Sequence, residues 1–199
     1  ILNSIAKGKA TVSNFDTYMR KQNEVLEASD FNMNFVTNHD ENSWSGTVKE
    51  RMGEASEILT TLVYAMPGMP LIYSGQEYDL NHRLKFFEKD SIPKTKGNTW
   101  NLLTKLGDLK NNHLAFHGGK IAASYERLTT ENENVVAFKR SKEVAEVYFI
   151  GNLSNQVQSF ILDVEGTYED LLLNKSLILN QKKIQLAPWQ YYLLNKVSP

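Results

Sequence analysis

The chain has 199 residues, of which 41% are hydrophobic and 23% charged, the ordinary balance of a globular protein. Its net charge of −1 gives no electrostatic footprint for nucleic acid or for an anionic membrane, and it holds no apolar run of the about 18 residues that a membrane-spanning helix needs. Because cysteine is absent, disulfides, thiolate catalysis and cysteine zinc sites are excluded, and the four histidines contain no helical zinc-binding pair.

The start of the chain carries no visible secretory signal peptide, and it opens at Ile1 without an initiator methionine. We therefore expect a processed or excised piece of a longer protein. Any targeting signal would then lie upstream, so the sequence leaves the localisation open.

The first elements predict a helical segment followed by a strand. Residues 1–30 read as helical, with Asn14 as a capping residue. Residues 31–37 form a strand candidate, and its last residues, 35–37, read as buried strand that ends abruptly in the polar residues 38–40. Parallel α/β folds build active sites from polar residues at the carboxyl ends of strands, so this stretch points to an enzyme. The apolar side of the helical segment consists of Phe15, Tyr18, Met19, Val25 and Leu26.

A helix and a second strand follow a polar loop. Thr47 and Glu50 form a predicted capping box at the start of an amphipathic helix over residues 48–66. Pro67-Gly68 stops this helix, and residues 69–74 are the next strand candidate. Strand, helix and strand with short connections make a βαβ unit, so the two strands should be parallel.

The second half of the chain changes in texture. Residues 78–97 are irregular, and a helix is predicted over residues 99–111. Short β-type runs separated by turn residues then predict an antiparallel sandwich or barrel. The fold class is therefore α/β followed by all-β, with a domain boundary near residues 113–120. The predicted strands are Ile121–Leu128, Val135–Arg140, Val144–Leu153, Ser159–Val164, Tyr168–Leu173, Ser176–Leu179, Lys183–Leu186 and Gln190–Leu194.

Three segments of the chain resemble one known family. Residues 35–43, FVTNHDENS, resemble the fourth signature segment of the α-amylase family, glycoside hydrolase family 13. Residues 67–77, PGMPLIYSGQE, resemble its eighth barrel strand and the loop after it. Residues 106–119, LGDLKNNHLAFHGG, are similar to its last barrel helix, and the all-β tail is similar to its C-terminal β-sandwich domain. The resemblance covers nearly the whole chain, in the family's order.

The resemblance implies a partial (β/α)₈ barrel, its last two strand–helix units, followed by an antiparallel β-sandwich domain. The expected domains are residues 1–117, the C-terminal part of the catalytic barrel, and residues 118–199, the sandwich. A whole barrel needs about 250 residues, and the family's nucleophilic Asp and acid Glu lie on earlier strands. Nothing in residues 1–34 matches the motifs that carry them. We therefore expect the C-terminal portion of a retaining glycosidase for α-1,4-linked glucans, inactive on its own.

Family analogy gives roles to the polar residues after the first strand. Asp40 would be the third acid of the site, which binds sugar hydroxyls and stabilises the distorted ring at the transition state, and His39 would donate to a neighbouring sugar hydroxyl. An Asp in this place can also simply cap a turn. Asn38 either contacts sugar or, as we favour slightly, braces the loop. Trp44 either stacks on a sugar ring or packs under the loop.

Other polar and aromatic residues leave two alternatives open. Gln76 and Glu77 should hydrogen-bond the barrel rim, but Glu77 and Asp40 on adjacent strand ends could instead form a self-sufficient acid pair. The β tail could also be a non-catalytic carbohydrate-binding or interaction module. Its aromatic run is more typical of sandwich core, and it consists of Trp189, Tyr191 and Tyr192.

The expected partners are an α-glucan oligosaccharide or polysaccharide and the upstream part of the same enzyme. We also expect self-association through the exposed edge of the cut barrel. We expect no nucleic-acid or membrane partner, and no cofactor in this chain. The family's calcium sites lie mostly in segments absent here, so calcium is expected only in the full-length parent.

Overall fold

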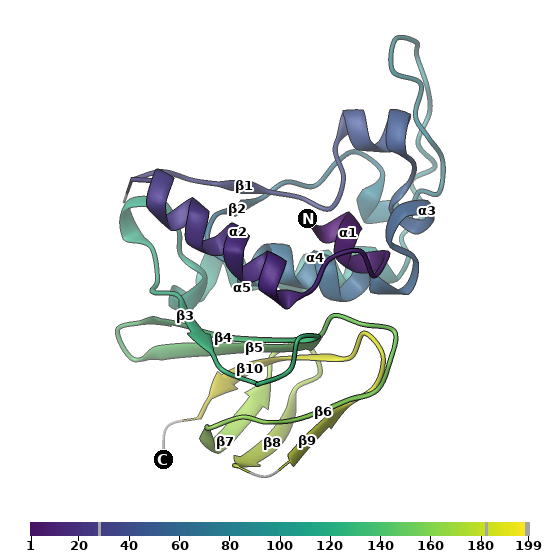
Figure 1. The fold of residues 1–199 in the computed structure, drawn as a ribbon. Coiled ribbons are helices and arrows are strands. Elements are labelled where there is room, and N and C mark those ends of the chain that lie inside the picture. Colours follow the sequence, from purple (N-terminus) through teal and green to yellow (C-terminus); the bar gives the residue numbers. More distant parts are fainter. Residues whose placement is uncertain (28, 182, 198–199) are drawn as a thin grey trace.

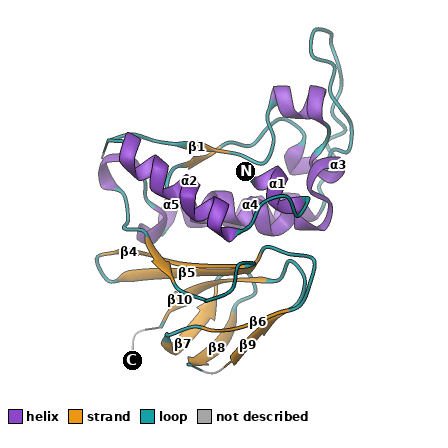
Figure 2. Cartoon of the chain, in the orientation of Figure 1, coloured by secondary structure: helices purple, strands orange, loops and turns teal. Residues whose placement is uncertain are grey.

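The computed structural model describes residues 1–27, 29–181 and 183–197, and it stacks a layer of helices on one face of a β-sheet (Figure 1). Figure 2 shows the division into a helical layer and a layer of strands. The α-helices are α1 (Leu2–Ala6), α2 (Val12–Val25), α3 (Val48–Met52), α4 (Ser56–Ala65) and α5 (Asn98–Asn112). The 3₁₀ turns are η2 (Gly53–Ala55), η3 (Gln76–Tyr78), η4 (Leu114–Phe116) and η5 (Gly119–Ile121), and η1 (Glu41–Ser45) is a π-helical turn.

The strands fall into one short parallel pair and two antiparallel sheets within the described residues. The parallel pair is β1 (Met33–Asn34) and β2 (Met69–Pro70). The large sheet has the order β3-β4-β5-β10-β7-β8, and β6 pairs with β9 in the small one. Their bounds are β3 (Glu126–Leu128), β4 (Val135–Lys142), β5 (Ala145–Asn152), β6 (Gln158–Ile161), β7 (Glu165–Asp170), β8 (Lys175–Asn180), β9 (Lys183–Leu186) and β10 (Tyr191–Lys196).

Helix α2 starts with a capping box that lies three residues earlier than the sequence suggests. Thr11 is the capping residue, and the Asn14 side-chain oxygen accepts a hydrogen bond from the Thr11 backbone N–H at 2.9 Å. The prediction that Asn14 itself is the cap was therefore wrong, because its side chain reaches back to the true cap. Val25, expected on the apolar side, is exposed at the last turn.

The β1–β2 pair is parallel, as predicted, but each strand has only two residues. The Met69 N–H donates to the Asn32 carbonyl and the Leu71 N–H donates to the Asn34 carbonyl, both at 2.8 Å. The prediction of strands over 31–37 and 69–74 was too long. Among the described residues each strand has a single neighbour, so there is no second ladder to extend it.

Burial along the first strand segment is mixed. Val36 and Thr37 are buried, but Phe31 and Met33 are exposed. The burial predicted for the stretch that begins at residue 35 is therefore found at Val36 and Thr37. The buried half is the half that leads directly into the polar residues 38–40.

The predicted helix over 48–66 is two helices. Its capping box is confirmed: the Glu50 N–H donates to the Thr47 hydroxyl at 3.2 Å, and the Thr47 N–H donates to the Glu50 carboxylate at 2.7 Å. Gly53, with a φ of 52°, ends α3 and opens the turn η2 before α4 resumes the same apolar face. Helix α4 ends at Ala65, just before Pro67-Gly68, as predicted.

The large sheet separates two cores. On β4 and β5, alternate side chains face the helices or face the small sheet, because successive side chains of a strand point to opposite faces. The helical core therefore crosses the predicted boundary near residues 113–120. The sheet residues in it include Val136, Phe138, Val147 and Phe149, and the second core includes Val135, Ala137, Tyr148 and Ile150. Tyr191 and Trp189 pack against the first core and Tyr192 packs against the second.

Arg140 on β4 ties the two layers together. Its side chain is fully buried and donates to the carbonyls of Ala65, Ser124, His117 and Ala123 at 3.0, 2.7, 2.8 and 3.3 Å. Ala65 is the last residue of α4, whose carbonyl end favours a positive charge. Burial lowers the pKa of Arg140 to about 10.

No helix in the described part of the chain is long and apolar enough to cross a membrane.

Candidate active site

The polar residues predicted at the end of the first strand lie where the chain turns from β1 into the π-helical turn η1. His39 and Asp40 immediately precede η1, and their side chains are 62% and 61% exposed. The His39 Nε2 atom lies 3.5 Å from the Asp40 Oδ2 atom. An exposed carboxylate and an imidazole therefore stand side by side at the strand end.

Asn38 braces the loop. Its side-chain oxygen accepts a hydrogen bond from the Glu41 backbone N–H at 2.8 Å, which closes a local turn. The side chain that caps this turn is therefore that of Asn38. Among the described residues, the recorded polar partner of the Asp40 carboxylate is His39 alone, so its remaining acceptor sites face solvent.

Arg51 on α3 holds the strand end and the turn in one position. Its side chain is buried and donates to the carbonyl of Val36 at 2.6 Å and to that of Gly46 at 2.9 Å. Its third nitrogen lies 3.2 Å from the carboxylate of Glu41. Burial lowers the pKa of Arg51, and Glu41 opposes that shift.

The sequence analysis did not single out Arg51, although a signal was there. Arg51 follows Val48 by three residues and precedes Met52, so helical spacing places it beside the apolar stripe. A charged residue in that place needs a buried partner or carbonyls to satisfy it.

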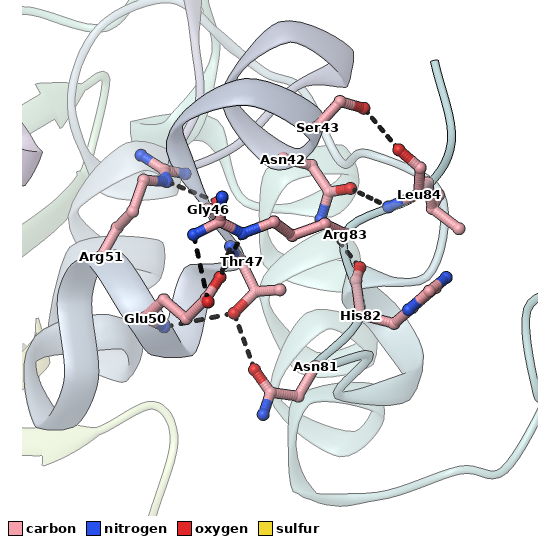
Figure 3. A network of polar contacts seen from close by, with 10 residues as sticks. All are labelled: Asn42, Ser43, Gly46, Thr47, Glu50, Arg51, Asn81, His82, Arg83 and Leu84. Carbon is pink, nitrogen blue, oxygen red and sulfur yellow. Dashed lines mark hydrogen bonds and ion pairs between the residues drawn. The ribbon is translucent and has the colours of Figure 1, made fainter. Parts of the chain in front are cut away.

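Residues 81–91, which we call the arm, project beyond the helical layer next to η1 (Figure 1). Figure 3 shows how the base of the arm is fixed to this turn. The Asn42 side chain accepts from the Leu84 N–H at 2.7 Å and donates to the His82 carbonyl at 3.2 Å. The Ser43 hydroxyl donates to the Leu84 carbonyl at 2.7 Å. The side chains of two consecutive residues of η1 therefore fix the backbone of the arm by hydrogen bonds.

The start of α3 adds a second set of contacts to the arm. The Thr47 hydroxyl donates to the Asn81 side chain at 2.7 Å. The Arg83 guanidinium forms a two-point contact with the Glu50 carboxylate, at 2.9 and 3.1 Å (Figure 3). The hydrogen bond from Arg83, helped by the Thr47 N–H, lowers the pKa of Glu50 to about 2.

The arm is also closed on itself. The Asp90 carboxylate lies 2.9 Å from the His82 ring nitrogen and accepts hydrogen bonds from the N–H groups of Lys85 at 3.0 Å and Ser91 at 2.8 Å. The Lys85 N–H, the His82 side chain and the Ser91 N–H lower the pKa of Asp90 to about 2. The arm therefore has its own internal bracing in addition to its anchor.

Aromatic rings gather between the strand end and the arm. The ring of Phe86 lies 5.7 Å from that of His39, 5.3 Å from that of Trp44 and 4.7 Å from that of Phe87, measured between centroids. Trp44 is 62% exposed, so its indole is not packed beneath the loop. No sequence signal links positions 44 and 86, because their contact depends on the fold of the arm.

Gln76 and Glu77 serve the turn after β2. The Glu77 carboxylate accepts from the Gly75 N–H at 2.8 Å, and the Gln76 side-chain oxygen accepts from the Tyr73 N–H at 3.4 Å. No hydrogen bond joins Glu77 to Asp40 in the described part of the chain. Both contacts are local to this turn.

The residues that the structure describes contain no group of three or more His, Asp or Glu side chains that could hold a metal ion.

The chain therefore combines a parallel α/β unit, in which polar residues follow the first strand, with an antiparallel sheet. The family model of the alpha-amylase catalytic domain matches residues 3–112, more than half of the chain. The chain therefore belongs to the alpha-amylase family. No curated protein matches the chain.

Solved structures share the fold. A noncanonic maltogenic alpha-amylase, AmyB from Thermotoga neapolitana, has a TM-score of 0.84 and 18% identity over 98% of this chain and 48% of its own. An alpha-amylase from Lactobacillus plantarum has a TM-score of 0.77 and 20% identity over 98% of this chain and 45% of its own. A gamma-CGTase from alkalophilic Bacillus clarkii has a TM-score of 0.72 and 18% identity over 98% of this chain and 30% of its own. The chain thus spans less than half the length of each.

Proposed function

We propose that this chain is the C-terminal portion of an α-amylase-type glycoside hydrolase that acts on α-1,4-linked glucans with retention. Residues 1–117 would be the end of its (β/α)₈ barrel and residues 118–199 its antiparallel β-sandwich. The observation that carries the proposal is the exposed Asp40 carboxylate beside His39, between β1 and η1 within the segment that matches the family.

The parallel pair supports the partial barrel. In a closed barrel every strand has a neighbour on each side. Strands β1 and β2 have only each other among the described residues, and relatives of the same fold are more than twice as long as the part this chain covers. We propose that the remaining strands are supplied by an upstream part of the same enzyme.

The chemistry assigns Asp40 a role in stabilisation. Glycoside hydrolysis with retention needs one carboxyl group that attacks the sugar carbon and another that protonates the leaving oxygen, while positive charge develops on the ring. Asp40 would accept hydrogen bonds from the hydroxyls of the distorted ring, and His39 would donate to a neighbouring hydroxyl. The nucleophile and the acid would lie upstream, so the isolated chain would be inactive.

The ligands named for two related structures support a glucan substrate. The alpha-amylase from Geobacillus thermoleovorans was solved with acarbose, and AmyP E221Q was solved with maltotriose. We propose that this chain contributes to a site for the same class of sugar.

The test is the release of reducing sugar from soluble starch by this chain and by the full-length parent, each beside its Asp40→Asn variant. We expect activity only in the unsubstituted parent, with a loss of at least about a hundredfold in the variant. Starch cleavage by the isolated chain that depends on Asp40 would instead favour an acid pair within the chain. A parent that is inactive, or equally active with Asn at position 40, would refute the proposal.

A further inference from the structure

We propose that the cavity between the helical layer and the start of β10 binds a short segment of an α-glucan chain, at a site separate from that at Asp40. The cavity has a volume of about 590 Å³. Its walls come from η2, α4 and α5 on one side and from β7, the turn after β7 and residues 188–192 on the other. Among the described residues that line it, none belongs to β1, η1 or the arm. The inference rests on the proposed function for the identity of the polymer, and it adds a second place at which the enzyme would hold that polymer.

Both walls of the cavity would stay in place in a complete barrel. Helix α4 lies between β1 and β2 in the chain and α5 follows β2, so the two helices would be neighbours in the outer ring of a (β/α)₈ barrel. The upstream strand–helix units would join beyond α2 and beyond α5, and none would come between α4 and α5. The opposite wall is formed by the antiparallel sheet of this same chain.

Trp189 presents its side chain to this cavity from a strained backbone. Its φ is 57°, a left-handed conformation that is rare for a bulky residue. The other described non-glycine residues with positive φ are all Asp, Glu, Asn or Gln. The turn is fixed by the Trp189 N–H, which donates to the Ser154 carbonyl at 3.0 Å, and by the Gln190 side-chain oxygen, which accepts from the Ala187 N–H at 2.9 Å. Strained residues that the surrounding structure holds in place are concentrated at ligand sites.

Polar side chains beside Trp189 use only part of their hydrogen-bonding capacity within the described residues. The Tyr191 hydroxyl donates to one oxygen of the Glu57 carboxylate at 2.9 Å and accepts from the Thr61 hydroxyl at 3.2 Å. The second Glu57 oxygen is left to accept from a ligand. The Lys105 ammonium donates to the Leu172 carbonyl at 2.7 Å, which uses one of its three protons. A carboxylate and an ammonium group therefore line the cavity together with an indole.

This combination of groups suits a carbohydrate. A pyranose ring has C–H groups on its faces, which pack on an indole, and hydroxyls on its rim, which donate to carboxylates and accept from ammonium groups. A purely apolar ligand would remove Glu57 and Lys105 from water without replacing their hydrogen bonds. An anionic ligand would meet three acids and one lysine, because Glu54 and Asp170 also line the cavity. The volume lies within the range of about 300–1,000 Å³ that is typical of small-molecule sites.

The test titrates this chain with maltotriose by isothermal titration calorimetry. We expect saturable binding with a dissociation constant in the millimolar range, and we expect Trp189→Gly to weaken it about tenfold. Glycine adopts the backbone conformation of position 189 without strain, so this variant removes the ring and keeps the turn. Glu57→Ala truncates an exposed side chain and should weaken binding about threefold or more while the chain stays folded.

A matched control is Phe31→Ala, which removes another partly exposed aromatic ring, outside the cavity. Phe31→Ala and Asp40→Asn should both leave the dissociation constant unchanged. The absence of saturable binding would overturn the site, and so would binding that neither Trp189→Gly nor Glu57→Ala weakens. Binding that is lost in Asp40→Asn would place the sugar after β1 and would overturn the site as well.

The full-length parent separates this site from the proposed function. There Trp189→Gly should lower adsorption to starch granules severalfold and should change kcat/KM for maltotriose by less than about twofold, because the cavity contains no residue of the site at Asp40. If Asp40→Asn abolishes starch cleavage while Trp189→Gly changes neither adsorption nor maltotriose binding, the proposed function stands and this site alone fails. If the parent is inactive and still binds maltotriose through Trp189, the proposed function fails and the cavity stands as a carbohydrate site.

Discussion

A terminal nitrogen of Arg51 lies 2.6 Å from the carbonyl oxygen of Val36, so a buried cation on α3 holds the segment that leads from β1 to His39 and Asp40. The same guanidinium binds the Gly46 carbonyl and the Glu41 carboxylate, at the two ends of η1. One side chain therefore sets the position of the strand end and the geometry of the turn that follows. It does so from a buried position, without contacting the Asp40 side chain.

Replacing Arg51 by Met should therefore damage both stability and the site. Two buried carbonyls and one carboxylate would lose their partner, so we expect the free energy of unfolding to fall by about 2–4 kcal/mol. Urea denaturation of this chain measures that loss. The control is Lys49→Met on the same helix, where the side chain is exposed. There the free energy of unfolding should change by no more than about 0.5 kcal/mol. Equal stability of the two variants would contradict the role of Arg51.

The anchor between Glu50 and Arg83 should make the arm sensitive to acid. The pKa of Glu50 is lowered from 4.5 to about 2, so the stabilisation from its charged form is present above pH 4.5 and is lost as the pH falls toward 2. We expect the melting temperature to fall over this range, and to fall less in Glu50→Gln. Because both side chains are exposed, high salt should reduce the difference between the two proteins.

Asp90 gives this experiment an internal reference. Its pKa is also lowered to about 2, so part of the acid response should remain in the Glu50→Gln variant. The control is Glu24→Gln, which breaks the exposed pair with Arg20 on α2 and should leave the acid response unchanged. An identical response in the Glu50→Gln variant and the unsubstituted protein would show that the anchor does not couple to folding.

Arg140 should be among the most costly residues to replace. Its guanidinium donates to four backbone carbonyls that no other described side chain satisfies, and one of them ends helix α4. We expect Arg140→Met to lower the free energy of unfolding by about 3 kcal/mol or more, because the carbonyls of Ala65, Ala123 and Ser124 lose this donor, whereas that of His117 keeps the Ala123 N–H. Urea denaturation, with Lys175→Met on the exposed face of β8 as the control, measures the loss. A loss within about 0.5 kcal/mol of the control would contradict this role.

Local signals in the sequence predicted much of this fold. The Thr47 and Glu50 capping box, the helix stop at Pro67-Gly68 and the parallel β1–β2 pair are confirmed. Each of the short β-type runs predicted in the second half overlaps a strand, and Lys183–Leu186 has the predicted bounds. Capping residues, breakers and period-2 patterns act over a few residues, so a single sequence contains them.

The errors arise where contacts between distant segments decide. The break at Gly53 keeps the apolar face of the helix in phase, so periodicity does not reveal it. Phe31 and Met33 look like strand core but lie on an exposed surface. Most of the site itself depends on such contacts: Trp44 meets Phe86 only because η1 binds the arm.

The exposed edge of the parallel pair should make the isolated chain self-associate. Strands β1 and β2 lack a second neighbour among the described residues, and their outer surfaces carry exposed apolar side chains. These are Phe31, Met33, Met69 and Ile72. Unpaired strand edges with exposed apolar side chains pair readily with another chain.

We expect light scattering coupled to size exclusion to give an apparent mass that rises with concentration, and we expect Met33→Lys to lower that mass. The exposed Val144→Lys, in the turn between β4 and β5, is the matched control and should leave the mass unchanged. In the full-length parent the edge would be paired, so Met33→Lys should there reduce stability instead of association. A monomer at every concentration would show that this edge is protected in some other way and would remove one support from the partial barrel.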